Sequence, residues 1–356
     1  MKRSGTATLP LHTGKAPAWL FNRMVKLAAA ILEILRLDFS EDEILLRLSH
    51  PHWFQAFGCV LGFDWHSSGI TTTVCGAIKE ALKDRQHAIG IYVAGGKGKA
   101  ALKTPQEIEQ IASRTGIDAE RLVNASRLSA KVDNSALQDG YRLYHHTIFF
   151  TENHNWCVIQ QGLNETNRLA RRYHWVSHLT SSFVNEPHAA ICAQAKSAYV
   201  LDLTAKESAK TRDACVEITT FAPDKTVDEL KRIVELELPR RHYITAADIN
   251  IARLKKQIVA IHEAHPQSFE QLLLTKGAGE KTLRALSLIS ELIYCAPPSI
   301  KDPARFSFAH GGKDGHPFPV DKETYDKSIE ILRKAVSKAR IGHYEKLRAL
   351  KRLSLF

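Results

Sequence analysis

The sequence predicts an α+β fold: a helix-rich N-terminal domain with a small sheet, followed by an all-α domain. Apolar residues recur at helical spacing toward both ends of the chain, and two short apolar runs near its middle are typical of a β-hairpin. We place the boundary near Leu238, Pro239 and Arg240, which divides the chain into residues 1–238 and 239–356. A chain of 356 residues, 44% of them hydrophobic, can bury a sizeable core in such an arrangement.

Helices are expected first. Residues 18–37 have the pattern of an amphipathic helix, and Ser40 followed by Glu43 has the spacing of a capping box that opens the next helix. The apolar run 88–94 is typical of a buried strand, and it leads into a loop of glycines and lysines at 95–99. This loop lacks the Gly-Lys-Ser/Thr ending of a phosphate-binding P-loop, so we expect a flexible basic loop that could contact DNA phosphate.

The middle of the chain is predicted to supply the sheet. Residues 141–150 and 156–161 are strand-like runs separated by a short polar segment, which is the pattern of a β-hairpin. Residues 199–203 are a further strand candidate. Thr226 with Glu229, and Thr245 with Asp248, are expected to open the helices that follow.

The densest cluster of polar residues surrounds this hairpin and predicts a catalytic site. We expect Asp133, Asp139 and His145 to bind a divalent metal, Mg²⁺ or Mn²⁺, with His145 or His146 as a further ligand or proton donor and Gln160 or Gln161 as orienting groups. A metal held by carboxylates can activate water and neutralise charge on phosphorus. The period of a strand places Asp139 and His145 on one face, together with Gln160 if the pairing of the two strands permits, and His146 on the other.

The cluster loosely resembles the restriction-endonuclease-like nuclease core, in which acids near two strands cooperate with a lysine. No acid-x-Lys motif follows Trp156, so the lysine of that family is missing. The alternative is a hydrogen-bonded strand cluster, or a surface that contacts RNA or DNA without catalysis. Asp64 with His66 is a second, weaker metal candidate.

Residues 269–294 predict two short helices around a tight glycine turn and resemble a helix-hairpin-helix element. Glycines at such a turn let phosphate oxygens approach the backbone N–H groups of the second helix. The groups expected to hold a DNA backbone, without reading bases, are Lys276, Gly277, Gly279, Lys281, Thr282 and Arg284. An ordinary helical hairpin is the alternative.

Basic residues also gather near the C-terminus. From Arg333 to Arg352 there are eight cations against the single anion Glu345, and the whole chain carries a net charge of +11. We expect Lys338 and Arg340 to contact phosphate, while the apolar face of their helix packs on the hairpin or on a second subunit, as in a homo-oligomer.

A third site is considered beyond the hairpin. In helix-hairpin-helix glycosylases the hairpin is followed by a Val-Asp whose carboxylate assists expulsion of the base, and Lys281 and Asp321 match those positions by residue type. Asp321 could equally cap the helix that follows it. His310 and His316 could bind a metal, although a turn around Asp314 explains them as well.

The six cysteines lie far apart, which argues against a disulfide framework or a zinc ribbon, and no signal peptide or membrane span is indicated. A cytoplasmic location is therefore expected. Several long motifs resemble the prokaryotic family known as domain of unknown function 763; they include GFDWHSSGITTTVCGAIKEAL, LQDGYRLYHHTIFF, WCVIQQGLN, ARRYHW and FAHGGKDGHPFPVD. The resemblance supplies no catalytic residues, and only the hairpin implies a role in DNA handling or repair.

These observations lead us to expect a DNA-binding protein, a metal-dependent nuclease that acts on the phosphodiester backbone whatever the base sequence. A non-catalytic DNA-binding or architectural protein of DNA repair is the first alternative. A helix-hairpin-helix DNA glycosylase is the second.

Overall fold

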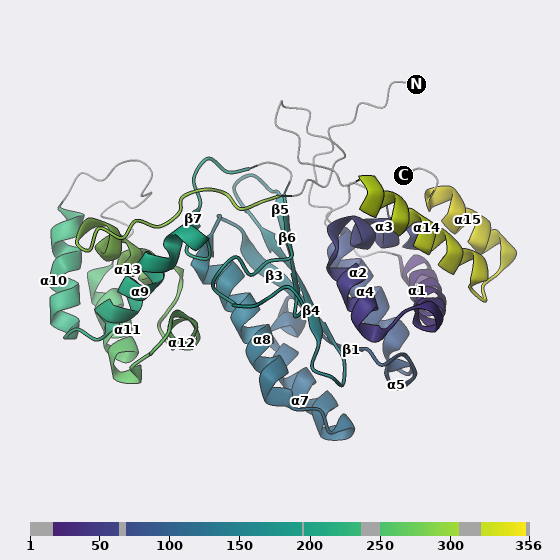
Figure 1. The fold of residues 1–356 in the computed structure, drawn as a ribbon, viewed down its shortest axis with the longest axis horizontal. Coiled ribbons are helices and arrows are strands. Elements are labelled where there is room, and N and C mark those ends of the chain that lie inside the picture. Colours follow the sequence, from purple (N-terminus) through teal and green to yellow (C-terminus); the bar gives the residue numbers. More distant parts are fainter. Residues whose placement is uncertain (1–16, 64–68, 194–195, 236–249, 306–321, 354–356) are drawn as a thin grey trace.

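A five-stranded antiparallel sheet stands between two groups of helices (Figure 1). The computed structural model describes residues 17–63, 69–193, 196–235, 250–305 and 322–353. The strand order is β1-β3-β4-β5-β6, formed by Tyr92–Lys97, Arg142–Phe150, Trp156–Leu163, Ala170–Val176 and Ala190–Cys192. A separate two-stranded ribbon pairs β2 (Leu137–Gln138) with β7 (Leu201–Asp202).

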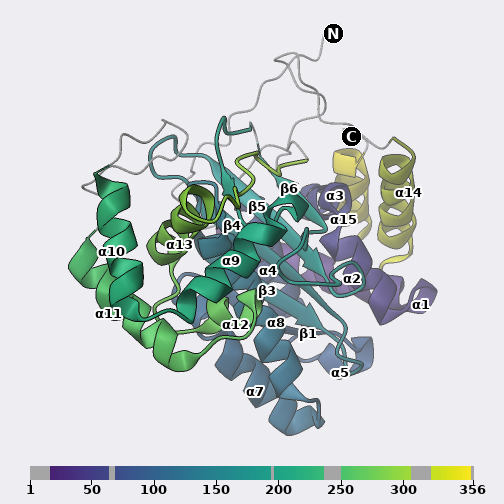
Figure 2. The same cartoon turned by 60° about the vertical axis from the view of Figure 1, so that its left-hand side comes forward.

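One helix group combines the two ends of the chain. It comprises α1 (Ala18–Asp38), α2 (Glu41–Ser49), α3 (Pro51–Leu61), α4 (Gly69–Leu82), the short α5 (Gln86–Ile89), and the C-terminal α14 (Lys322–Lys338) and α15 (His343–Leu353). Its apolar side chains form one cluster with Val93, Phe149, Cys157 and Ile159, which point to this face of the sheet. The α14–α15 pair lies beside α1 and α3 in both views of the molecule (Figures 1 and 2).

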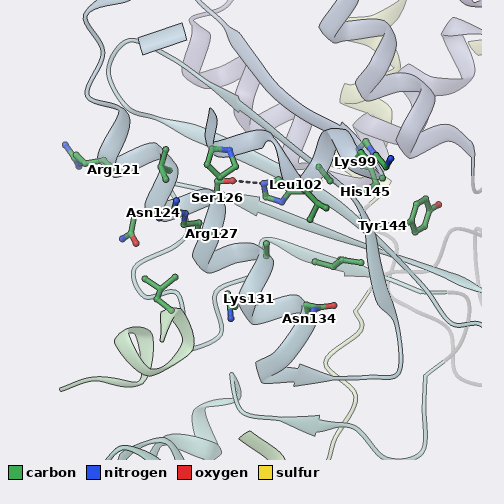
Figure 3. Close-up of a pocket in the computed structure, with 18 of the residues that line it drawn as sticks. Lys99, Leu102, Arg121, Asn124, Ser126, Arg127, Lys131, Asn134, Tyr144 and His145 are labelled. Atoms are coloured by element: carbon green, nitrogen blue, oxygen red, sulfur yellow. Dashed lines mark hydrogen bonds between the residues drawn. The ribbon is translucent and has the colours of Figure 1, made fainter. Parts of the chain in front are cut away.

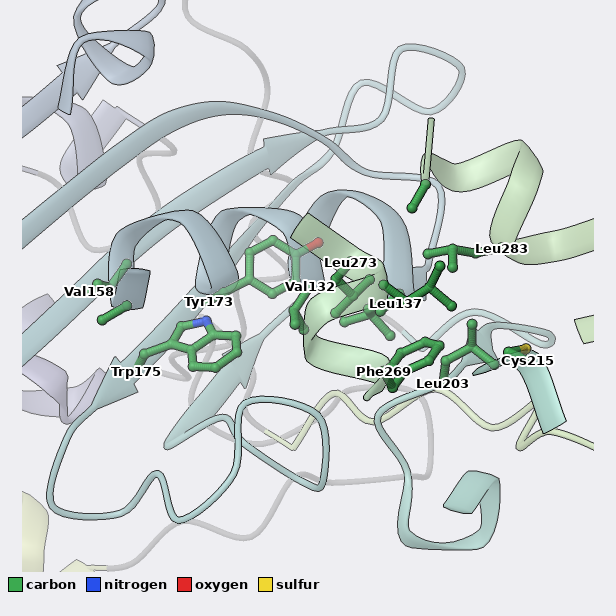
Figure 4. Packing of buried hydrophobic residues seen from close by; sticks show 14 of the residues in the cluster. Val132, Leu137, Val158, Tyr173, Trp175, Leu203, Cys215, Phe269, Leu273 and Leu283 are labelled. Atoms are coloured by element: carbon green, nitrogen blue, oxygen red, sulfur yellow. The ribbon is translucent and has the colours of Figure 1, made fainter. Parts of the chain in front are cut away.

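The second helix group covers the opposite face. It comprises α6 (Lys99–Leu102), α7 (Thr104–Thr115), α8 (Ala119–Lys131), α9 (Ala209–Thr219), α10 (Pro223–Val234), α11 (Ile251–Ala264), α12 (Phe269–Leu274) and α13 (Glu280–Leu292), with a single π-helical turn η1 (Val132–Ala136) and a 3-10 turn η2 (Lys206–Ser208). The core on this side runs without a break from Val158 and Trp175 in the sheet to Phe269 and Leu283 in α12 and α13 (Figure 4).

The helices after residue 238 therefore do not form one unit. Helices α11 to α13 pack with α9, η1 and α8, whereas α14 and α15 pack on the other side of the sheet. The boundary predicted at Leu238, Pro239 and Arg240 lies outside the described residues. Each of the two hydrophobic clusters contains residues from both before and after this boundary. The structure groups the chain by face of the sheet, and this grouping differs from the predicted division at residue 238.

Several predicted elements are confirmed and others shift. Helix α1 and strands β3 and β4 match the predicted runs, and Ser40 forms the expected capping box with Glu43. The strand predicted at 88–94 begins only at Tyr92, because a short helix precedes it and ends at Gly90, whose φ is +75°. Helix α10 begins at Pro223, whose missing N–H suits a first turn, so Thr226 does not open it. Thr245 and Asp248 lie outside the described residues.

The central strand explains why both faces need helices. In β4, every residue from Trp156 to Gly162 is buried, so its side chains meet packed neighbours above and below. Antiparallel sheets often leave one face in water, and this one does not. No helix among the described residues is long and apolar enough to cross a bilayer.

The packing of α14 on the N-terminal helices can be tested by a cavity mutation. Leu332 in α14 is fully buried, so Leu332→Ala is expected to lower the free energy of unfolding by about 2–5 kcal/mol in urea denaturation. Leu347 in α15 is 52% exposed, and Leu347→Ala is the control, with an expected change within about 0.5 kcal/mol. Equal stabilities of the two variants would show that α14 does not pack as described.

Candidate functional site

The two faces of the β3–β4 hairpin carry different polar clusters. His146 lies opposite Gln160 and His145 opposite Gln161, so the first pair points toward α8 and the second toward α3 and α4. This corrects the expectation that His145 and Gln160 share a face. Alternation cannot be counted from Asp139, because Gly140 turns the chain at φ +83° and the β3–β4 register shifts between Leu143 and His145.

A chain of hydrogen bonds runs through the cluster on the α8 face. The hydroxyl of Ser126 lies 2.8 Å from His146 Nε2, and His146 Nδ1 lies 2.8 Å from Gln160 Oε1. Gln160 Nε2 donates to Asp133 Oδ2 at 2.5 Å and to the carbonyl of Ser129 at 3.2 Å. The four side chains connect α8, β3, β4 and the π-helical turn, and all are buried.

The direction of each bond in this chain follows from the chemistry of its ends. A carboxylate and a carbonyl can only accept, so the amide nitrogen of Gln160 must face Asp133 and Ser129. Its oxygen then faces His146 and accepts from Nδ1–H. Neutral imidazole carries one proton, so Nε2 is left with a lone pair and Ser126 donates to it. The geometry thus prepares the hydroxyl of Ser126 to lose its proton to His146.

Asp133 anchors this arrangement. Besides Gln160, its carboxylate accepts from Trp175 Nε1 at 2.9 Å, and His188 Nε2 lies 2.5 Å from its other oxygen. Trp175 comes from β5, and His188 lies just before β6. Asp133 itself sits in the π-helical turn that continues α8, a local departure that often marks functional positions.

Burial keeps His146 neutral. Its pKa is lowered from the usual value, because burial disfavours the charged ring more than the hydrogen bond to Gln160 and the charge of Asp133 favour it. A neutral ring is the form that can accept a proton from Ser126.

Asp139 belongs to a different cluster. It accepts from Arg171 at 3.0 Å and from Tyr173 Oη at 2.7 Å, and Arg171 also forms a two-bond pair with Asp302. Burial raises the pKa of Asp139 to about 6, although Arg171 and Tyr173 oppose the shift. This ion-pair cluster ties the segment after α13 to the sheet.

His145 and Gln161 lie on the other face. His145 Nε2 is 3.1 Å from the hydroxyl of Thr147, and burial lowers the pKa of His145 to about 3, with smaller contributions from His146 and Lys97. Gln161 donates to Tyr144 Oη at 2.5 Å. Neither residue belongs to the chain that runs from Ser126 to Asp133.

The three predicted metal ligands therefore do not fit one ion. The oxygens of Asp133 are engaged by Gln160, Trp175 and His188, those of Asp139 by Arg171 and Tyr173, and His145 is on the opposite face. Across the part of the chain that the structure describes, no group of three or more His, Cys, Asp or Glu side chains could hold a metal.

A large cleft opens beside the Ser126–His146 pair. It has a volume of about 1170 Å³ and lies between the β1–α6 loop, α8, β3 and the end of α12 (Figure 3). Ser126 and His146 both line it, and the hydrogen bond of Ser126 is drawn as a dashed line in Figure 3. Its basic lining residues are Lys99, Arg121, Arg127 and Lys131, and the one carboxylate among the described lining residues is that of Glu120.

Those four cations stand apart from the carboxylates of the described residues. Within the described ranges, no carboxylate lies at ion-pair distance from any of them. Lys131 is half-buried, and burial lowers its pKa. Cations left without carboxylates on a concave surface are suited to an anionic ligand.

The predicted hairpin residues are only partly exposed. Helices α12 and α13 flank the turn, and Gly277 has φ +101°, where an added Cβ would lie 3.2 Å from the carbonyl oxygen of Gln257. Lys276 and Lys281 are exposed. Thr282 was predicted to contact phosphate, but it is 1% exposed and donates to Gly277 O.

Two further predicted contacts differ in their surroundings. Arg284 donates to Gln138 Oε1 at 2.7 Å and pairs with Glu280, so it is partly engaged within the protein. Lys338 pairs with Asp38 of α1 at 3.1 Å, and Arg340 is exposed just after α14. Helix α14 lies on the opposite side of the sheet from α12 and α13. Lys338 and Arg340 therefore do not form one surface with the hairpin (Figure 1).

Five further candidate residues come from other segments of the chain. Asp64, His66, His310, His316 and Asp321 lie outside the described residues. The carboxylate that the glycosylase interpretation needs is among them.

A model of the family described as protein of unknown function (DUF763) matches residues 5–320. The chain belongs to the DUF763 family. No curated protein and no solved structure is detectably similar to this DUF763 chain. The family assignment confirms the resemblance seen in the motifs and assigns no activity.

Sequence reasoning missed Ser126, His188 and the cleft cations of α8. A signal for the cations existed, because Arg127 and Lys131 are four residues apart and so share one helix face. Ser126 carried no such signal, since its role depends on a contact with a strand twenty residues later.

Burial of neutral histidines makes stability depend on pH. The pKa values of His145, His146 and His174 are all lowered by burial, so below about pH 6.5 the unfolded chain binds protons that the folded chain does not. The free energy of unfolding should therefore decrease as the pH is lowered from about 7 to about 5, with a slope that approaches about 1.4 kcal/mol per pH unit for each histidine that stays neutral in the folded chain.

Urea denaturation across this range measures the slope. His145→Gln removes one of these groups and should reduce the slope near pH 5 by about 1.4 kcal/mol per pH unit. A stability that does not change over the range, or an unchanged slope in the variant, would contradict the buried neutral state.

Proposed function

We propose that this protein binds DNA through its phosphodiester backbone, without reading bases, in the cleft between α6, α8 and α12. The observation that carries the proposal is the set of four cations in the cleft, Lys99, Arg121, Arg127 and Lys131, with no carboxylate partners among the described residues. Phosphate contacts supply most sequence-independent affinity for DNA. The net charge of +11 favours the same partner.

The surroundings of Lys131 support an anionic ligand. Removing a lysine partly from water is costly, and a phosphate oxygen nearby would offset that cost. Arg127 lies one helical turn before Lys131 on α8, so the two can meet one phosphate or two successive phosphates along a strand.

The form of the cleft suits a polymer. It is open to solvent, and its rim carries the exposed side chains of Leu102 and Leu274, which are 79% and 39% exposed. Leu274 ends α12, and Lys276 in the glycine turn follows it by two residues. The turn can therefore extend the path of a backbone that leaves the cleft, with Lys276 and Lys281 as further phosphate contacts.

A binding measurement with charge-matched variants tests this proposal. Arg127→Ala/Lys131→Ala should weaken binding to a labelled duplex in fluorescence anisotropy, because two phosphate contacts are lost. It should also reduce the slope of log K against log[salt] by about 2. Lys231→Ala/Arg232→Ala removes the same charge from α10, whose two residues pair with Asp228 and Glu229, and is the control.

The control variant should keep the affinity and slope of the parent protein. If both variants bind DNA equally weakly, the loss of affinity comes from the lower net charge and not from the cleft. If the slope of log K against log[salt] is unchanged in the cleft variant, the DNA binds elsewhere on the protein. Absence of salt-dependent binding in the parent protein would contradict the proposal as a whole.

A further inference from the structure

We propose that Ser126 is a nucleophile, with His146 as its general base, that attacks the phosphodiester held in the cleft. The inference rests on the proposed function, because its substrate is the bound DNA backbone. The observation that carries it is that both side chains line the cleft and are joined by a 2.8 Å hydrogen bond that Ser126 donates. A serine hydroxyl is a weak nucleophile until an adjacent base takes its proton.

The hydroxyl of Ser126 does not behave as serine hydroxyls in helices usually do. Such hydroxyls commonly bond a carbonyl one turn earlier, as Ser129 does with the carbonyl of Ser126 at 3.1 Å. Ser126 instead points its hydroxyl across to β3, at a ring whose accepting nitrogen is fixed by Gln160. Ser113 in α7 also follows the usual pattern, since its hydroxyl donates to the carbonyl of Gln110 at 3.0 Å.

The other side chains in this series of hydrogen bonds hold the general base, His146, in position. Asp133 fixes the amide of Gln160, and the amide fixes the tautomer of His146, so Asp133 and Gln160 are positioning residues. This order of nucleophile, imidazole and orienting acceptor is the arrangement by which serine hydrolases activate their hydroxyl. Here the group that accepts from Nδ1–H is an amide oxygen, itself held by a carboxylate.

The proposed reaction consumes only water besides the phosphodiester. Ser126 Oγ forms a bond to phosphorus and passes its proton to His146 Nε2, the bond from phosphorus to one deoxyribose oxygen breaks, and His146 returns the proton to that oxygen. Water then attacks the phosphoserine diester and gives a proton to His146, the Oγ–P bond breaks, and Oγ recovers the proton. One diester and one water yield a phosphate monoester end and a hydroxyl end.

The cations of the cleft suit a phosphoryl group better than an uncharged ester. Lys131 and Arg127 come from the same helix as Ser126, and Lys99 is the first residue of α6, which also lines the cleft. Cations placed around transferring phosphorus stabilise the charge on its oxygens. Ser126 and His146 are 3% and 5% exposed, so a protruding phosphate can reach them more readily than a flat base pair can.

Trapping the covalent intermediate tests the inference on the full chain. End-labelled single-stranded and duplex DNA are incubated with the protein in EDTA, denatured in detergent and analysed for DNA linked to protein, with the site mapped by mass spectrometry after nuclease digestion. The parent protein should give cleaved DNA and an adduct on Ser126. Ser126→Ala should lose both, by about 10³-fold or more, while its affinity for DNA is unchanged.

Ser113→Ala is the control, because the exposed hydroxyl of Ser113 in α7 only donates to the carbonyl of Gln110 at 3.0 Å, and this variant should cleave and form the adduct as the parent does. His146→Gln should lose cleavage with its DNA affinity kept. Cleavage that persists in Ser126→Ala, or that requires a divalent metal, would overturn the inference. Salt-dependent binding without an adduct or product would overturn it and leave the proposed function standing, whereas failure of the parent protein to bind DNA would overturn the proposed function first.

Discussion

The carboxylate of Asp133 is the constraint on which the site depends. It is fully buried in the turn after α8, where an unpaired charge would be costly, and it is satisfied by groups from three other places in the chain. Gln160 comes from β4, Trp175 from β5, and His188 from the segment before β6. One buried acceptor therefore fixes the end of α8 against the middle of the sheet, and it aligns the side chains that lead to the cleft.

The two buried acids near the hairpin have different consequences. Asp139 is neutralised by Arg171, which also holds Asp302, so its interactions end in an ion-pair cluster that joins two segments. Asp133 has no arginine or lysine partner among the described residues, and its influence passes through Gln160 to His146 and Ser126. A carboxylate that orients a chain of neutral groups leaves the last hydroxyl polarised at the floor of a basic cleft. The contacts of Asp133 therefore lead to a hydroxyl in the cleft, whereas those of Asp139 end in ion pairs.

The sequence predicted the parts of the fold that depend on local pattern. Strands β3 and β4 and the Ser40 capping box follow from residue spacing, and the structure has them. The faces of the hairpin could not be predicted, because Gly140 and the irregular register at Leu143 interrupt the alternation. The site was missed where it depends on distant contacts: the direction of the Ser126 hydroxyl is set by β3, and the inward turn of Thr282 is set by Gln257 of α11. The place of α14 beside α1 likewise depends on packing across nearly the whole chain.

The site depends on Asp133, which through Gln160 holds His146 as the neutral tautomer with its proton on Nδ1. Nitrogen-15 NMR of histidine-labelled protein near neutral pH measures this directly, with the His146→Gln variant used to assign the signals. We predict a protonated Nδ1 and an unprotonated Nε2 for His146, and loss of that preference in Gln160→Ala. A proton on Nε2, or on both nitrogens, would mean that the ring cannot accept from Ser126 and would contradict the account.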